Sequence, residues 1–201
     1  MDLTRKLGAG ANYSVEVAVY TSLLSNTRVG PTMSDSVALF NSAHGNLAGS
    51  GAAPSQTTLE AAVAAMMEQS GTGQDSSSVA LGVAPKFWFA KPAVAMAIEK
   101  IIGSDYAGSD ARRDPQVQAI ANTTVIKVPC MTALGVSNDW YAAADQALAP
   151  SYEVGFLRGN RTPRIQIQNV PTVDGTTVVV DLDYAAFPTG GWQGIYRNPG
   201  A

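Results

Sequence analysis

Residues 79–90 read VALGVAPKFWFA, a run that is rich in aromatic residues and apolar on both faces. Such a run is typical of a strand at the centre of a sheet that is covered on both sides. Pro85 cannot donate a hydrogen bond to a neighbouring strand, so we expect it at an edge or a bend. Pro92 suits the first turn of a helix, and Gly103 ends the apolar stripe that follows. The stretch predicts a central strand followed directly by a helix.

The residues before this stretch predict two helices separated by a long loop. Residues 12–26 carry both strand-like and helix-like apolar spacing, and their length favours a helix capped by Asn12. Residues 27–56 look irregular, and a loop of that length usually serves a function or an interface. Thr57 and Glu60 have the spacing of a capping box. The helix that they open would bury a stripe made of Leu59, Ala62, Val63 and Met66.

Beyond residues 104–114, which we expect to form a mobile loop, the apolar period changes from helical to alternating. We predict strands at residues 123–128, 139–143 and 152–157. Farther on, Asp174-Gly175 predicts a two-residue hairpin turn between a strand with Ile165 and Ile167 and a return strand over residues 178–184. Asp181 and Asp183 share one face of that return strand without a partner motif. A solvated or intersubunit face is the better interpretation than a catalytic pair.

The composition is poor in charge. Apolar residues make up 46% of the 201 residues and charged residues 14%. Such a chain either hides much of its surface against copies of itself or has a surface rich in small residues. The net charge of −3 argues against a dedicated nucleic-acid binder. For the arginines Arg158, Arg161 and Arg164, a solvated or intersubunit role is favoured over a DNA-facing one.

Residues that could carry chemistry are scarce. A single cysteine, Cys130, excludes an internal disulfide, and it cannot build a cysteine-based metal site. Pairing Cys130 with the single histidine, His44, as nucleophile and base is a weak hypothesis, because we expect no helix start at Cys130 to lower its pKa. No cofactor or metal motif is found, and the apolar runs are too short to span a bilayer. We expect a soluble chain without a signal peptide, made in a reducing compartment.

Three groups of segments together resemble a known family. They are YTSLLSN (20–26) with LFNSAHGNL (39–47); LGVAPKFWF (81–89) with Pro92 and its helix; and YEVGFLRG (152–159) with the ending GWQGIYRNPG (191–200). Their content and order are similar to those of the Mu-like prophage major head subunit, which also occurs as the C-terminal part of prohead protease–capsid fusions. The resemblance runs over nearly the whole chain, from residue 12 to residue 200.

The resemblance implies an α+β chain with the Hong Kong 97 phage capsid fold. It assigns residues 1–29 to the spine helix region, residues 30–148 to an axial domain, and residues 149–201 to peripheral strands and the C-terminal tail. Family members carry an N-terminal arm and an extended loop before the spine helix. Because only about a dozen residues precede the expected helix here, we expect a fragment, a trimmed chain or a subunit completed by another chain.

The function implied is that of a non-enzymatic shell subunit of a tailed-phage icosahedral head around double-stranded DNA. Its partners would be copies of itself in hexameric and pentameric capsomers, the packaged DNA through weak non-specific contacts, and portal, scaffold or decoration proteins. It would be made in the bacterial cytoplasm and reside in the virion. An encapsulin-like nanocompartment shell and a cytosolic hydrolase using Cys130 and His44 are the alternatives. The candidate intersubunit contacts are Leu39, Phe40, His44, Asn46, Arg158, Arg161, Arg164, Trp192 and Tyr196. For Phe40, packing of the loop onto its own domain is the alternative.

Overall fold

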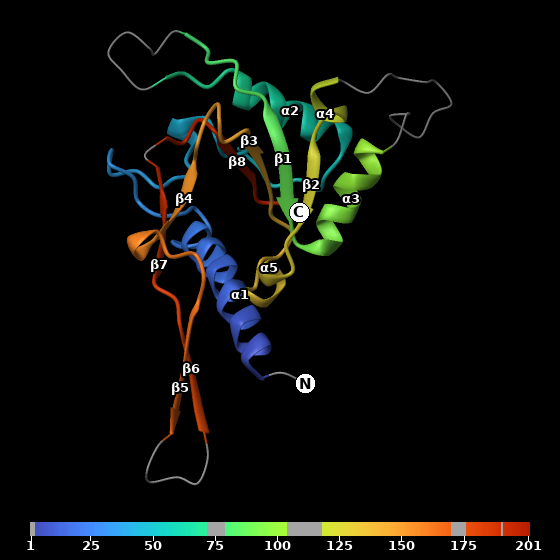
Figure 1. Cartoon of the computed structure of the whole chain (residues 1–201). Helices are drawn as coiled ribbons and strands as arrows, with labels where there is room; N and C mark the ends of the chain where they lie inside the picture. The colour runs from blue at the N-terminus through green and yellow to red at the C-terminus, as the bar shows by residue number, and fades with distance from the viewer. Residues whose placement is uncertain (1–2, 72–78, 104–117, 170–175, 190) are drawn as a thin grey trace.

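A computed structural model describes residues 3–71, 79–103, 118–169, 176–189 and 191–201 (Figure 1). Mixed helices and strands surround one four-stranded sheet of order β2-β1-β3-β8, and two further sheets have two strands each. The elements are α1 (Leu3–Leu23), η1 (Ser42–His44), α2 (Gln56–Met67), β1 (Pro85–Ala90), α3 (Pro92–Ile102), α4 (Gln118–Ala121), β2 (Thr124–Lys127), α5 (Cys130–Ala133), β3 (Trp140–Ala144), β4 (Tyr152–Phe156), η2 (Leu157–Gly159), β5 (Arg164–Asn169), β6 (Thr176–Asp181), β7 (Tyr184–Pro188) and β8 (Ile195–Asn198). The predicted α+β class is confirmed.

β1 is the central strand that the sequence predicts. It pairs in parallel with β2 and antiparallel with β3, and Pro85 is its first residue, next to a register irregularity. Because side chains alternate along a strand, Trp88 and Phe89 enter two separate buried clusters. The expected helix follows at once as α3, with Pro92 in its first turn and Gly103 at its C-cap.

Helices cover one face of the sheet. Trp88 of β1 and Trp140 of β3 pack there at a ring distance of 5.8 Å, against α2, α3 and α4. The predicted α2 stripe of Leu59, Ala62, Val63 and Met66 is fully or almost fully buried on this side. The predicted capping box is wrong by two residues: Ser55 caps the helix and exchanges hydrogen bonds with Thr58. Glu60 instead accepts a hydrogen bond from Gln56.

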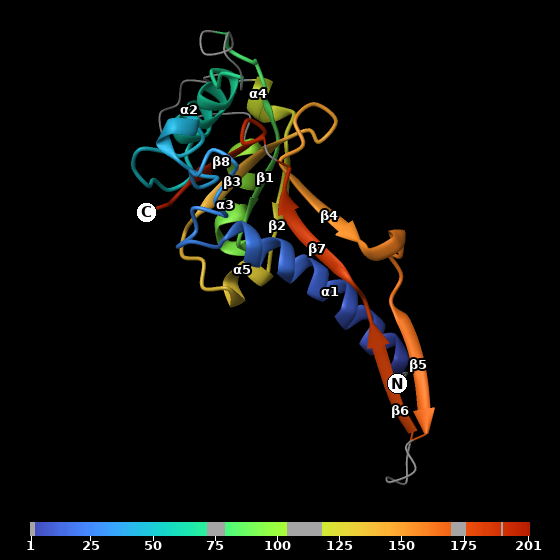
Figure 2. The ribbon, with the colours of Figure 1, turned by 90° about the vertical axis from the view of Figure 1, so that its left-hand side faces the viewer.

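The other face is covered by the C-terminal end of α1, by α5 and by the loop before α2. Phe89 and Tyr141 stack there with ring centres 5.0 Å apart. The expectation that Asn12 caps α1 is wrong, because the helix already begins at Leu3. Its N-terminal half packs on β6 and β7, so tertiary contacts extend the helix beyond the part with a clear apolar period (Figure 2).

The C-terminal strand returns to the central sheet. β8 pairs antiparallel with β3, with Tyr141 opposite Arg197 and Ala143 opposite Ile195. The resemblance groups residues 149–201 with the peripheral strands, but this last strand joins the sheet that the preceding part of the chain builds. Backbone pairing across such a sequence distance leaves no local signal, which explains the difference.

Between β3 and β8 the chain forms a long ribbon that leaves the body of the molecule beside α1 (Figure 2). β4 pairs with β7 at its base, and β5 pairs with β6 farther out. The register sets Thr176 opposite Asn169. The turn predicted at Asp174-Gly175 lies outside the described residues, as does the expected loop at 104–114.

The burial of Phe40 gives the first prediction. Phe40 is 1% exposed in the cluster beneath the sheet, so Phe40→Ala should lower the free energy of unfolding of the unassembled subunit by about 3–5 kcal/mol. Leu148, 65% exposed, is the matched control, and its replacement by alanine should change that free energy by about 0.5 kcal/mol or less. Urea unfolding of both variants measures the difference. A stable Phe40→Ala subunit that associates poorly would contradict the core position.

Candidate interaction surfaces

The LFNSAHGNL segment packs its larger side chains into its own subunit. Leu39 and Phe40 are 0% and 1% exposed, and Asn46 is fully buried. The Asn46 side chain donates to the Leu39 carbonyl oxygen at 2.7 Å and accepts from the Asn41 amide at 3.0 Å. Gly45 takes a left-handed conformation (φ 66°) that ends the short helix η1. These contacts fold the loop onto the sheet, which is the alternative that the sequence left open for Phe40.

The ending GWQGIYRNPG packs against that same loop. The Arg197 amide donates to the Asn46 carbonyl oxygen at 2.9 Å, and the Arg197 carbonyl oxygen accepts from the Ala48 amide at 3.0 Å. The rings of Trp192 and His44 stack with centres 4.1 Å apart. Tyr196 is 5% exposed in the cluster under the helices. Two of the segments that carry the sequence resemblance therefore lie side by side and hold each other.

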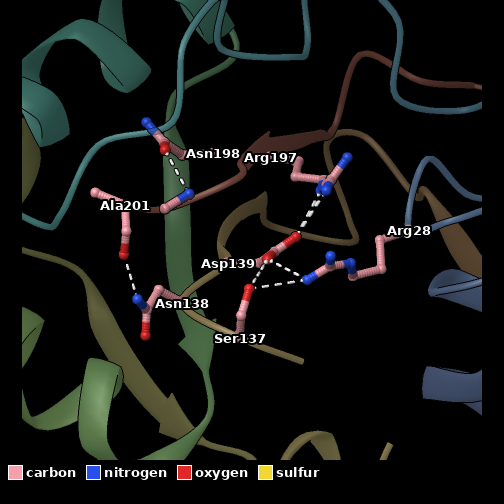
Figure 3. A network of polar contacts seen from close by, with 8 residues as sticks. Arg28, Ser137, Asn138, Asp139, Arg197, Asn198 and Ala201 are labelled. Atoms are coloured by element: carbon pink, nitrogen blue, oxygen red, sulfur yellow. Dashed lines mark hydrogen bonds and ion pairs between the residues drawn. The ribbon is translucent and has the colours of Figure 1, made fainter. Parts of the chain in front are cut away.

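A buried carboxylate holds this junction together (Figure 3). Asp139, 1% exposed, accepts from Nη2 of Arg197 at 2.7 Å and from Nη1 of Arg28 at 3.0 Å. The Arg197 side chain is 7% exposed and the Arg28 side chain 36%. Two guanidinium groups compensate one carboxylate, which is what an ion pair needs when it is taken out of water. The network joins the turn after α1, the residue before β3, and β8.

The last residues of the chain also pack against their own subunit. The Asn198 side chain accepts from the amides of Ala52 and Gly200 at 2.9 and 3.0 Å. Gly200 has φ 72°, and a side chain there would overlap the backbone of Asn138. The Asn138 side chain donates to the Ala201 carbonyl oxygen (Figure 3). The Asn-Pro-Gly ending is thus explained by close backbone packing within the subunit.

The three arginine candidates are on the surface. Arg158, Arg161 and Arg164 are exposed around the start of the outer ribbon. Arg164 pairs with Asp181 across the ribbon at 3.0 Å, and Arg161 lies 5.9 Å from the centre of the Phe156 ring. Arg158 has φ 55° within η2. The structure brings the three to one region, where two of them already have partners within the subunit.

The sequence did not single out one exposed apolar surface, formed by α1 and β5, as an interaction candidate. Ile165 and Ile167 of β5 are 46% and 66% exposed, and Leu3 of α1 is 58% exposed. Ile165 faces Val180 across the ribbon, and Val180 lines a hollow with Leu7 of α1. Paired residues share a face, so the apolar face that α1 partly covers continues outward along β5. We call Leu3, Leu7, Ile165 and Ile167 the ribbon strip. The alternation at Ile165 and Ile167 was the available signal, but it does not tell which face is covered.

A second apolar hollow, of about 420 Å³, lies between α1 and the central sheet. Tyr20, Phe87 and Tyr152 line it, together with Ile126, which is 41% exposed. Burial raises the pKa of Tyr20 to about 12, so its hydroxyl stays neutral at physiological pH. The Tyr152 hydroxyl donates to Ser22 Oγ and thereby ties the base of the ribbon to α1.

The proposed cysteine–histidine dyad is not assembled. Cys130 Sγ lies 3.9 Å from a carboxylate oxygen of Glu16, while the ring nitrogens of His44 contact Leu39 and Asp35. The expectation that no helix starts at Cys130 is wrong, because the short helix α5 begins there. Burial and the Glu16 carboxylate nevertheless raise the pKa of the thiol, the opposite of activation. Within the described ranges, no three acidic, histidine or cysteine side chains gather to hold a metal ion, and no helix could cross a membrane.

A body whose distinctive motifs serve its own packing, with an apolar ribbon projecting from it, is typical of a structural subunit that associates with other chains. The profile of the phage capsid protein family matches residues 1–198. The chain therefore belongs to the phage capsid proteins, a structural family whose members form the shell of the virion. No curated protein and no solved structure matches it.

The buried network gives the second prediction. Asp139→Ala would leave Arg197 buried without its counter-charge, so it should lower the free energy of unfolding by about 3–5 kcal/mol. Arg28→Ala removes the more exposed partner and should cost about 1 kcal/mol. Denaturant unfolding of the two variants under identical conditions measures both. Equal losses would show that burial of the charge is not what makes Asp139 important.

Proposed function

We propose that the chain is the shell subunit of a tailed-phage icosahedral head that packages double-stranded DNA, and that its fold is of the Hong Kong 97 type. The order of elements supports this proposal. A long helix, α1, leads into a sheet domain, and the chain then returns along α1 as a ribbon of strands (Figure 2). In this proposal α1 is the spine helix, residues 30–148 with β8 form the axial domain, and β4 to β7 form the peripheral domain.

The ribbon strip is the observation that carries the assembly role. An isolated two-stranded ribbon is marginally stable in water, and the outer ribbon has only part of one face covered by α1. Leaving Ile165 and Ile167 in water forfeits the free energy that burial would provide. Neighbouring subunits in a shell would supply the missing cover. Many modest contacts of this kind sum to a stable capsid.

Ring formation follows from the shape of such a contact. In a ring of subunits, the ribbon strip of one subunit would meet a different surface of its neighbour. Contacts between unlike surfaces close into rings when the rotation permits, which is how one chain would form hexameric and pentameric capsomers. The net charge of −3 fits a shell that touches its DNA weakly and without sequence preference.

Electron microscopy and size-exclusion chromatography of the expressed protein test the proposal. We expect closed icosahedral particles, and DNA inside particles recovered from a bacterium that produces the phage. A protein that stays monomeric under all assembly conditions would contradict the shell role. Particles that hold an enzyme and no genome would instead support the nanocompartment alternative.

The ribbon strip gives the third prediction. Ile165→Ser combined with Ile167→Ser should leave the melting temperature of the unassembled subunit within a few degrees of the parent, since both side chains are half or more exposed. Particle yield should fall at least tenfold. Gln168→Ser is the matched control, because Gln168 is an exposed neighbour on the opposite face of β5. Normal particles from the double variant would remove the ribbon strip from the interface.

A further inference from the structure

His44 is held by contacts from three directions. Its Nδ1 lies 3.0 Å from the carbonyl oxygen of Leu39, and its Nε2 lies 2.7 Å from Oδ2 of Asp35. The ring also stacks on Trp192, with an angle of 11° between the ring planes. The side chain is 3% exposed, so water does not replace these partners.

The two polar partners set the proton count. A carbonyl oxygen and a carboxylate oxygen both accept hydrogen bonds, and neither donates. A neutral imidazole has one N–H, so it could satisfy one of them and would turn a lone pair toward the other. Both short contacts are satisfied together when one further proton resides on the His44–Asp35 pair.

We propose that the ring of His44 carries this proton and that the Asp35–His44–Trp192 cluster is a proton-sensitive clasp, which fastens the C-terminal segment to the loop before α2. The proposal rests on contacts within one subunit and does not depend on the shell role. Trp192 belongs to the tail, whereas Asp35 and His44 belong to the loop. The face of an indole ring attracts a cation, so protonation of His44 strengthens the stack as well as the hydrogen bonds.

Asp35, the charged group in direct contact with His44, also makes the clasp depend on pH. Among the described residues, Asp35 is the ionisable group that hydrogen-bonds to His44, and its other partner is the Val37 amide. The hydrogen bond from His44 and that from Val37 hold the pKa of Asp35 below its usual value. A lowered carboxyl pKa means that this contribution is present above the unfolded value and is lost as pH falls through the folded value. Loss of the ring proton would leave one of the two acceptors of His44 without a donor, so the clasp weakens when the ring is deprotonated.

His44 is the single histidine of the chain, which makes the test direct. Labelling histidine with ¹⁵N gives one pair of ring nitrogen signals in NMR spectra of the subunit or of its particles. We expect both nitrogens to be protonated at neutral pH, where a free imidazole has mostly lost its second proton. A ring with one protonated nitrogen at neutral and at weakly acidic pH would overturn the proposal.

Two variants separate the clasp from simple packing. Asp35→Asn keeps the size of the side chain and should shift the ring to its neutral form at neutral pH. Trp192→Phe keeps an aromatic partner and should retain both protons on the His44 ring.

Hydrogen exchange of the Ala48 and Arg197 amides, which join the loop to β8, reports how firmly the C-terminal segment is held to the loop. After correction for intrinsic rates, their exchange should accelerate several-fold from weakly acidic to alkaline pH in the parent and much less in Asp35→Asn. Identical pH dependence in the parent and in Asp35→Asn would refute the clasp.

Discussion

The antiparallel pairing of β8 with β3 is the contact on which the rest of the subunit depends. The backbone N–H and C=O of Arg197 both bond the loop at Asn46 and Ala48, while its strand β8 pairs with β3. Its guanidinium group reaches Asp139, which also binds Arg28 in the turn after α1. These contacts connect four segments that are distant in sequence. Removing a partner from a buried ion pair is costly, so these segments are held in one arrangement.

The sheet that this pairing completes separates two aromatic clusters. Strand alternation sends Trp88 and Trp140 toward the helices, and it sends Phe89 and Tyr141 toward α1, α5 and the loop. With large side chains buried on both faces, the body of the subunit is largely complete by itself. Exposed apolar side chains remain on α1 and on the ribbon, among them Leu3, Ile165 and Ile167, and others lie elsewhere on the body. A body with a buried core and a ribbon with exposed apolar side chains suit a capsid protein, which is made as a single chain and assembles into a shell.

The loop–tail junction is the contact between the LFNSAHGNL loop (39–47) and the C-terminal segment GWQGIYRNPG (191–200). It fixes the C-terminal segment that follows the ribbon, while α1 holds the ribbon itself. The His44–Trp192 stack and the Asp139 network act at the same junction. Asp139 is paired with two permanently charged guanidinium groups, whereas the proposed clasp depends on a proton held between Asp35 and His44.

By itself, the sequence determined the central strand, the helix after it, the buried stripe of α2 and the approximate positions of β2, β3 and β4. It also indicated a phage capsid protein, and the profile match confirms that class. These features follow from local periodicity and from proline and glycine, whose effects act within a few residues. Only the tertiary structure decided that α1 begins at Leu3, that β8 joins the central sheet, and that the candidates Leu39, Phe40 and Tyr196 are buried. Whether an apolar residue faces its own core or a neighbour depends on which distant segment covers it, and local spacing contains no record of that partner.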